Sequence, residues 1–232
     1  MIGWLIYSAV DVEKNKYYIQ MYKDKFKEHF IEIKLVIVEE LENMEQYVKC
    51  NKVDFAINRS RNHIMGELLE QKGVRVFNSS SVTRIANNKG ITYEFLKDVV
   101  PFLAVKYGNE IIESKIENKG FEYPYVIKSC SGHGGSQVFL VNNSKEDEQA
   151  VKAMNGQEYV VQQCCSDLGR DVRVYIIGNK IIKAVLRTST ESFKSNYSLG
   201  GKVQEYTLNN EEKAMVERIV DKLPLDYAGI DF

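Results

Sequence analysis

Apolar and polar residues follow two patterns over the first eighty residues, one typical of strands and one typical of helices. Short runs rich in apolar and β-branched side chains predict four strands, over residues 2–7, 31–38, 53–57 and 74–77. Between the first two runs, side chains spaced by three or four predict an amphipathic helix. These side chains are Tyr18, Met21, Tyr22, Phe26 and Phe30. A second helix is expected over 63–72, ended by Gly73, so residues 1–80 predict an α/β domain with a parallel sheet.

The pattern changes after a polar break at residues 79–81. Helical spacing covers 88–99, 144–154 and 209–223. Strands are expected at 123–129, 137–141, 158–163, 171–177, 180–186 and 227–232. Gly178-Asn179 suits a two-residue hairpin turn, and both Ser144 with Asp147 and Asn209 with Glu212 have capping-box spacing. We therefore expect two further α+β subdomains, over 81–156 and 157–232.

Composition narrows the class of protein. Hydrophobic residues make up 44% of the chain and charged residues 27%, as in ordinary globular domains. The balance of 31 basic against 32 acidic side chains argues against a general nucleic-acid binder. No apolar run approaches the roughly 20 residues that span a bilayer, and the N-terminus lacks the features of a signal peptide. The four cysteines have no C-x-x-C spacing, so we expect free thiols and a cytoplasmic protein.

A glycine-rich segment carries the clearest chemistry. In YPYVIKSCSGHGGSQVFLV, residues 123–141, a strand ends at Lys128 and a loop follows before the next strand. Glycines allow backbone N–H groups to approach phosphate oxygens, and the lysine adds a positive charge. The candidate phosphate-binding residues of this loop are Gly132, Gly134, Gly135 and Ser136. The lysine precedes the glycines, so this is no Walker A motif, and a mobile hairpin tip is the alternative.

Two other segments could contact the same ligand. Lys89 stands near the start of a predicted helix, where a cation is unfavourable unless an anion is bound; a solvated lysine is the alternative. After the apolar strand 158–163, Gln163 and Cys164 could offer backbone groups to an adenine edge. An ordinary edge strand would explain that segment equally well.

Charged residues in the last third of the chain suggest a second cluster. Asp171 and Arg173 alternate with valines and should share one face of a strand, as a functional pair or an exposed salt bridge. Arg187, Lys194 and Asn196 lie in a polar loop, LRTSTESFKSNYSLGG, that would suit binding of an anionic substrate and stabilisation of charge on a transferring phosphoryl group. Asp231 closes the last strand and could bind Mg²⁺, although one carboxylate does not make a metal site.

Six phrases together resemble the ATP-grasp superfamily and, within it, the RimK-like glutamate ligases. In order they are NNKGITYEFL, PYVIKSCSGHGGSQVFL, EYVVQQCC, GRDVRVYIIGNK, LRTSTESFKSN with a following GG, and LDYAGID. The resemblance implies an N-terminal parallel-sheet α/β domain followed by an ATP-grasp fold of two α+β subdomains. It implies an ATP-dependent carboxylate–amine ligase in which a carboxylate becomes an acyl-phosphate and an amine then attacks it, with glutamate or another amino acid joined to a peptide or small molecule.

The resemblance also assigns roles. It implies that Lys89 and Lys128 bind the phosphates of ATP under the glycine-rich loop, and that Gln163 and Cys164 meet the adenine. Asp171 and Arg173 would lie near the nucleotide, and Arg187 and Asn196 near the γ-phosphate and acyl-phosphate; Asp231 would bind Mg²⁺ or Mn²⁺. The implied partners are ATP, a carboxylate substrate and an amino acid or peptide as amine, with no nucleic acid or membrane; a homo-oligomer is left open.

Three departures separate this sequence from the family pattern. Gln137 stands where some relatives carry glycine, and Cys164-Cys165 replaces hydrophobic or aromatic residues. The family's Glu-x-Asn metal-binding pair does not occur before Phe232, so we expect a C-terminally truncated form or a shortened, impaired relative. The alternatives are a non-catalytic nucleotide-binding module without a complete metal site, and a kinase on the same fold.

Overall fold

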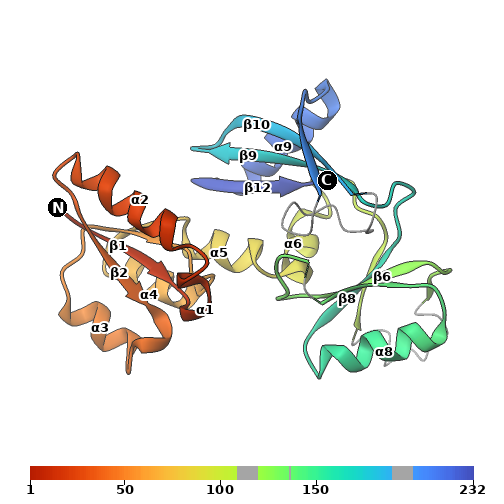
Figure 1. The fold of residues 1–232 in the computed structure, drawn as a ribbon, viewed down its shortest axis with the longest axis horizontal. Helices are drawn as coiled ribbons and strands as arrows, with labels where there is room; N and C mark the ends of the chain where they lie inside the picture. The colour runs from red at the N-terminus through yellow and green to blue at the C-terminus, as the bar shows by residue number, and fades with distance from the viewer. Residues whose placement is uncertain (109–119, 136, 190–200) are drawn as a thin grey trace. The chain divides into compact units, whose positions relative to one another are not determined.

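A computed structural model describes residues 1–108, 120–135, 137–189 and 201–232 (Figure 1). The chain forms two compact units, Met1–Arg84 and Ile85–Phe232, each considered by itself below. The division of the chain at residues 80 and 156 stays a sequence prediction. No helix within the described ranges has the length and apolar character needed to cross a membrane. All four cysteines are free thiols.

The first unit contains a parallel four-stranded sheet in the order β2-β1-β3-β4. Its strands are β1 (Ile2–Tyr7), β2 (Glu32–Ile37), β3 (Phe55–Asn58) and β4 (Arg75–Phe77). The helices are α1 (Ala9–Val12), α2 (Lys16–Lys27), 3-10 helix η1 (Val38–Glu40), α3 (Met44–Cys50), α4 (His63–Gln71) and α5 (Ser80–Ala86), which continues past Arg84. The parallel α/β architecture predicted for this segment is confirmed. Its core includes Trp4, Ile6, Met65 and Leu69, all fully buried, because strand and helix bury their apolar faces against each other.

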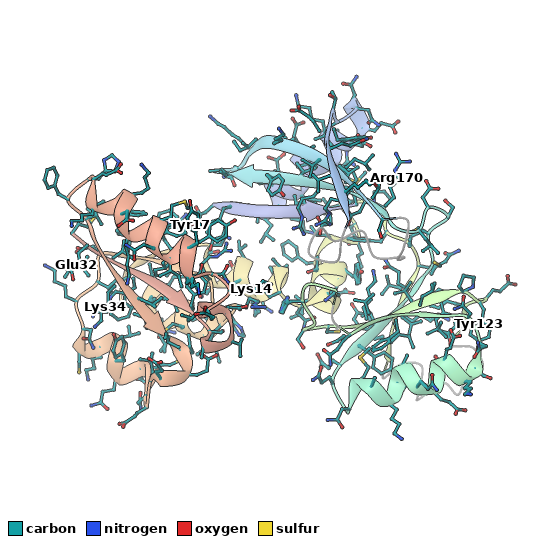
Figure 2. All side chains as sticks on the ribbon, viewed as in Figure 1. Lys14, Tyr17, Glu32, Lys34, Tyr123 and Arg170 are labelled. Atoms are coloured by element: carbon teal, nitrogen blue, oxygen red, sulfur yellow. The ribbon has the colours of Figure 1, made fainter. Side chains whose placement is uncertain are left out.

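The α2 helix buries only part of the face expected, since Tyr22 and Phe26 are half-buried and stack on each other. Tyr18 and Met21 are exposed, and Phe30 is 94% exposed. Ile19, which was not expected, is buried, and Phe26, which was expected, stacks on Phe55 of β3 with ring centroids 5.6 Å apart. The helix ends at Lys27, so Phe30 lies beyond its periodicity. Figure 2 shows the side chains of this unit, including Tyr17, which is also exposed on α2.

The second unit contains two antiparallel sheets. The first has the order β5-β8-β6-β7, formed by β5 (Val105–Tyr107), β6 (Tyr125–Ser129), β7 (Val138–Val141) and β8 (Tyr159–Gln163). One face packs on α8 (Ser144–Met154) through Tyr125, Ile127 and Met154. The division expected at residue 156 assigned the β8 segment to the later part of the chain, but β8 pairs with β5 and β6. Its four buried residues suit a central strand.

The second sheet has the order β11-β10-β9-β12. Its strands are β9 (Arg170–Ile177), β10 (Lys180–Thr188), β11 (Lys202–Tyr206) and β12 (Tyr227–Asp231). Gly178 and Asn179, with φ angles of 55° and 63°, join β9 to β10 and confirm the predicted hairpin. Ile230 of this sheet packs with Leu96 of α6 (Lys89–Leu96) and Ile219 of α9 (Asn210–Lys222). The unit therefore contains two antiparallel sheets, each packed with helices, as the resemblance to the ATP-grasp fold implies.

One of the two predicted helix caps is correct. Asn209 and Glu212 form a reciprocal capping box at α9. The prediction for α8 is wrong by one residue, because Asn143 is the N-cap and accepts from the backbone N–H of Glu146, 3.0 Å away. Asp147, expected to complete that cap, instead accepts from the Tyr125 hydroxyl at 2.8 Å.

Candidate functional site

Two lysines reach one region from separate elements. Lys89 is the first residue of α6, whose N-cap is Asn88, and its backbone N–H donates to the carbonyl of Cys130 at 2.9 Å. Lys128 stands near the end of β6, where it pairs with Val160 of β8. A main-chain hydrogen bond therefore joins the start of α6 to the segment that follows β6. This bond fixes the backbone positions from which the two lysine side chains extend.

The two ammonium groups lie in a partly desolvated environment. Lys89 Nζ donates to the carbonyl oxygen of Gly132 at 2.5 Å. Lys128 Nζ donates to Gln162 Oε1 at 2.6 Å. Burial lowers the pKa of both lysines, and the charge of Lys89 lowers the pKa of Lys128 further. Within the described part of the chain, no carboxylate contributes to either shift. A bound anion would stabilise both charged forms, so the pair fits the phosphates of a nucleotide.

The glycine-rich loop lies beside Lys89. The Lys89–Gly132 bond ties α6 to the loop, and Gly134 and Gly135 have φ angles of 62° and 82°. Gln137 also has a positive φ, 52°, a region that favours glycine. Ser136 falls outside the described residues. The contact with Lys89 supports a shared role for lysine and loop; their assignment to phosphates stays a prediction.

The residues expected at the adenine follow β8. Gln163 is exposed, and its backbone N–H donates to the carbonyl of Ala104 at 2.9 Å. Cys164 is half-buried near Lys128: burial and the neighbouring Cys165 raise the pKa of its thiol, while the Lys128 charge opposes the shift. The structure thus brings Cys164 near Lys128, and its contact with adenine stays a prediction.

Sequence reasoning missed Gln162 and Tyr93. Gln162 is 8% exposed, and its Oε1 accepts from Lys128 and, at 3.5 Å, from the Tyr93 hydroxyl. Burial, the largest influence, raises the pKa of Tyr93 to about 12. The only signal was a glutamine inside the apolar phrase YVVQQ, because a buried polar side chain needs a partner.

A second cluster lies on one face of the β9–β10–β12 region. Val172 and Val174 are buried on the opposite face, which confirms the predicted alternation around Asp171 and Arg173. The two charged residues do not pair with each other. Arg173 donates from Nε and Nη2 to both oxygens of Asp231, each at 2.6 Å. This bidentate pair joins β9 to β12, whose residues 173 and 231 are register partners.

Arg187 joins the same cluster from β10. It is 5% exposed and donates to both oxygens of Asp171, at 2.6 and 2.5 Å. Its Nη2 also lies 3.1 Å from Asp231 Oδ1. Burial acts to lower the pKa of Arg187, but the Asp171 bonds and the charge of Asp231 outweigh it and raise the pKa. Asn196, the expected neighbour of Arg187, lies outside the described residues.

Gly229 gives Arg173 the room to reach Asp231. A Cβ at residue 229 would lie 3.3 Å from Arg173 Nε, tighter than ordinary contact. The glycine of the LDYAGID phrase therefore lets the guanidinium lie across β12.

Arginine side chains occupy the Asp231 carboxylate, so its oxygens are not available to a metal ion. Both its oxygens accept from Arg173, and Arg187 approaches one of them. In the described ranges, no group of three or more His, Cys, Asp or Glu side chains could hold a metal. These residues alone do not fit Mg²⁺ or Mn²⁺, which would have to displace an arginine from Asp231. The metal-binding role of Asp231 stays a prediction.

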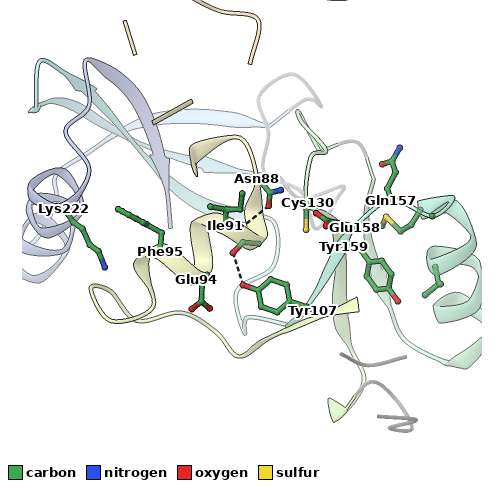
Figure 3. Close-up of a pocket in the computed structure, with 14 residues that line it drawn as sticks. Asn88, Ile91, Glu94, Phe95, Tyr107, Cys130, Gln157, Glu158, Tyr159 and Lys222 are labelled. Carbon is green, nitrogen blue, oxygen red and sulfur yellow. Dashed lines mark hydrogen bonds between the residues drawn. The ribbon is translucent and has the colours of Figure 1, made fainter. Parts of the chain in front are cut away.

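A cavity of about 1070 Å³ borders the start of α6, where Asn88, Gly90 and Cys130 are among its lining residues (Figure 3). Ile91 and Phe95 of α6, Tyr107 of β5 and Tyr159 of β8 form apolar parts of its wall. The Tyr107 hydroxyl donates to the carbonyl of Gly90 at 2.9 Å, drawn as a dashed line. None of the site residues expected from the sequence is among its lining residues, so we do not assign the cavity to the nucleotide.

Comparisons with known proteins agree with this fold and arrangement. Residues 86–232 match the family described as the RimK-like ATP-grasp domain, and the chain belongs to this family. It is 31% identical to Uncharacterized protein MG011 of Mycoplasma genitalium over 96% of this chain and 75% of that protein. It is 25% identical to a Probable alpha-L-glutamate ligase of Haemophilus ducreyi, over 69% of this chain and 54% of that protein.

A solved structure supports the fold over the whole length. The RimK domain ATP-grasp protein of Sphaerobacter thermophilus aligns with a TM-score of 0.73 and 19% identity, over 100% of this chain and 85% of that one. At this identity the likeness establishes the ATP-grasp fold and no more.

Proposed function

We propose that this chain is an ATP-dependent carboxylate–amine ligase that forms an amide bond through an acyl-phosphate. The observation that carries the proposal is the Lys89–Lys128 pair. Two ammonium groups from different elements lie close enough to lower the pKa of Lys128, partly removed from water, beside a glycine-rich loop. A triphosphate would supply the negative charge that this pair lacks.

The chemistry asks the protein mainly to position its substrates. Phosphoryl transfer to a carboxylate depends on alignment and on neutralising charge, with little covalent work for side chains. Arg187 and Arg173 lie on one face of the second sheet, where each is paired with a carboxylate, Asp171 or Asp231. In this proposal the guanidinium groups bind the carboxylate substrate or the charge of the transferring group. PsnB, a solved protein of the same fold, is described in complex with Mg and ADP, so Mg²⁺ is the cation to supply together with ATP.

An amino acid or peptide is the proposed amine or carboxylate substrate. The Haemophilus ducreyi relative is named a probable alpha-L-glutamate ligase, and a solved relative of the same fold, PsnB, is described in complex with a precursor peptide. These names support the substrate class, with glutamate as the first amino acid to test.

Calorimetry with Mg·ATP tests the nucleotide site, and ADP release in mixtures of amino acids and peptides tests the reaction. We expect saturable binding and ADP release that requires both a carboxylate and an amine. Absence of nucleotide affinity would contradict the proposal. A phosphorylated product that persists without an amine would instead indicate a kinase.

The arginine contacts of Asp231 favour one second candidate, a nucleotide-binding module without turnover. A carboxylate held by two guanidinium groups is a poor ligand for a cation. This candidate predicts nucleotide binding with no ADP release in any substrate mixture.

A further inference from the structure

Gln162 and Lys128 are diagonal neighbours on one face of the first sheet. Lys128 pairs with Val160, and Gln162 follows two residues later in β8, so both side chains project to the same side. This face is opposite the one that packs on α8, where Tyr159 and Val161 lie. The bond of 2.6 Å between Lys128 Nζ and Gln162 Oε1 is therefore set by strand register.

The Lys128 contact decides which end of the Gln162 amide faces the lysine, because an ammonium group can only donate. Tyr93 is a second neighbour of the amide oxygen. Its hydroxyl lies 3.5 Å from Gln162 Oε1, and its ring meets Phe102 edge-on with centroids 5.0 Å apart. Since burial raises the pKa of Tyr93 to about 12, the hydroxyl keeps its proton at neutral pH. The amide oxygen therefore faces the Lys128 ammonium group at 2.6 Å, and the Tyr93 hydroxyl lies at the outer limit of hydrogen-bond distance.

A neutral hydrogen-bond acceptor beside Lys128 affects the lysine charge differently from a carboxylate. Among the described residues, the titratable groups that act on Lys128 are Lys89, Cys164 and Cys165, and Tyr93 lies behind Gln162. A glutamate would form an ion pair and cancel the lysine charge that a ligand meets. The amide orients the ammonium group and leaves its charge uncancelled.

We propose that Gln162 is a positioning residue that holds the Lys128 ammonium group for the triphosphate while leaving its charge available. This proposal rests on the proposed ATP site. It assigns a role to a residue that touches the lysine and not the reacting atoms.

Gln162→Glu is the test, because it keeps the shape and adds one negative charge. ATP affinity should fall at least tenfold at pH 7, since the ion pair competes with the phosphates. The pKa of Lys128, followed by NMR of ¹³Cε-labelled lysine without nucleotide, should rise. Gln162→Met removes the acceptor without adding charge, and should lower both the ATP affinity and the Lys128 pKa. Opposite pKa shifts with the same loss of affinity would not arise from general damage to the fold.

Gln46→Glu controls for net charge, because Gln46 is exposed on α3 in the other compact unit. It should leave ATP affinity within about twofold of wild type. If Gln162→Glu raises the Lys128 pKa but binds ATP like wild type, or leaves both unchanged, the role of Gln162 is wrong. If Gln162→Glu does not fold, Gln162→Met decides: wild-type affinity in that variant contradicts the role. A wild-type chain with no ATP affinity would contradict the proposed function itself.

Discussion

At the residue scale, the pKa values of the site lysines depend on burial and on one or two neighbouring groups. Lys89 and Lys128 are ordinary lysines in the sequence, but desolvation and their mutual repulsion lower the pKa of Lys128. Burial likewise lowers the pKa of Lys89. The protonated forms of both lysines are therefore less stable in the unliganded protein than in water, and a bound anion would stabilise them.

This environment predicts that ATP binding takes up protons. Above the lowered pKa, the free protein has lost a proton that the phosphate complex needs, so affinity should fall as pH rises through that pKa. Calorimetry at alkaline pH in two buffers of different ionisation enthalpy would measure the uptake. In the same window the unfolded chain holds more protons, so the free energy of unfolding of the unliganded protein should rise with pH. Binding without proton exchange at any pH would contradict the assignment of these lysines.

Gln137 offers a second test at the residue scale. Its φ of 52° places a non-glycine residue where glycine is favoured, at a strain of roughly 1 kcal/mol. Gln137→Gly should therefore leave the free energy of unfolding unchanged or raise it by up to about 1 kcal/mol. Gln204→Gly in the regular strand β11 is the matched control and should lower it by roughly 0.5–1 kcal/mol. Urea unfolding measures both; equal losses in the two variants would contradict the strain.

At the scale of elements, strand pairing brings charged residues together that lie far apart in the sequence. Asp171 and Arg187 are register partners on β9 and β10, and Arg173 and Asp231 on β9 and β12. Each pair forms two hydrogen bonds, so one arginine–carboxylate ion pair joins β9 to β10 and another joins β9 to β12.

The degree of burial predicts how much each cross-strand pair contributes. Arg187 and Asp171 have side chains 6% and 23% exposed, whereas Lys183 and Glu205 in the same sheet are 51% and 76% exposed. Double-mutant cycles to alanine should give a coupling energy of about 1–3 kcal/mol for the first pair. The second pair should give about 0.2–1 kcal/mol, because water screens it. Equal coupling in both cycles would show that burial does not decide the strength here.

At the scale of the whole molecule, ligand binding should raise the free energy of unfolding. A ligand that binds only the folded chain at 100 times its dissociation constant raises the free energy of unfolding by about 2.7 kcal/mol. ATP should therefore raise the melting temperature of wild type, and Lys128→Ala should reduce that shift by weakening affinity at least tenfold. Lys180→Ala, an exposed lysine at the start of β10, removes the same charge and should keep the full shift. A full shift in Lys128→Ala would contradict its role.

Local signals predicted most of the elements. Ile2–Tyr7 and Ser144–Met154 have the bounds expected from their apolar spacing, and the Gly178-Asn179 turn follows from backbone preferences of those two residues. Strands β5 and β11 were missed because neither contains a fully buried residue, so their sequences lack the apolar run that predicted the other strands. Phe30 was wrongly assigned to the buried face of α2 because it continues the spacing after the helix has ended at Lys27.

The sequence by itself determined the order of strands and helices and the lysine, glycine and arginine phrases, because period and spacing are local properties. Tertiary structure alone decided that β8 lies between β5 and β6, which places Gln162 against Lys128. It also decided that Asp231 meets Arg173 across 58 residues of chain. Such contacts depend on strand register between distant segments, which no local pattern encodes.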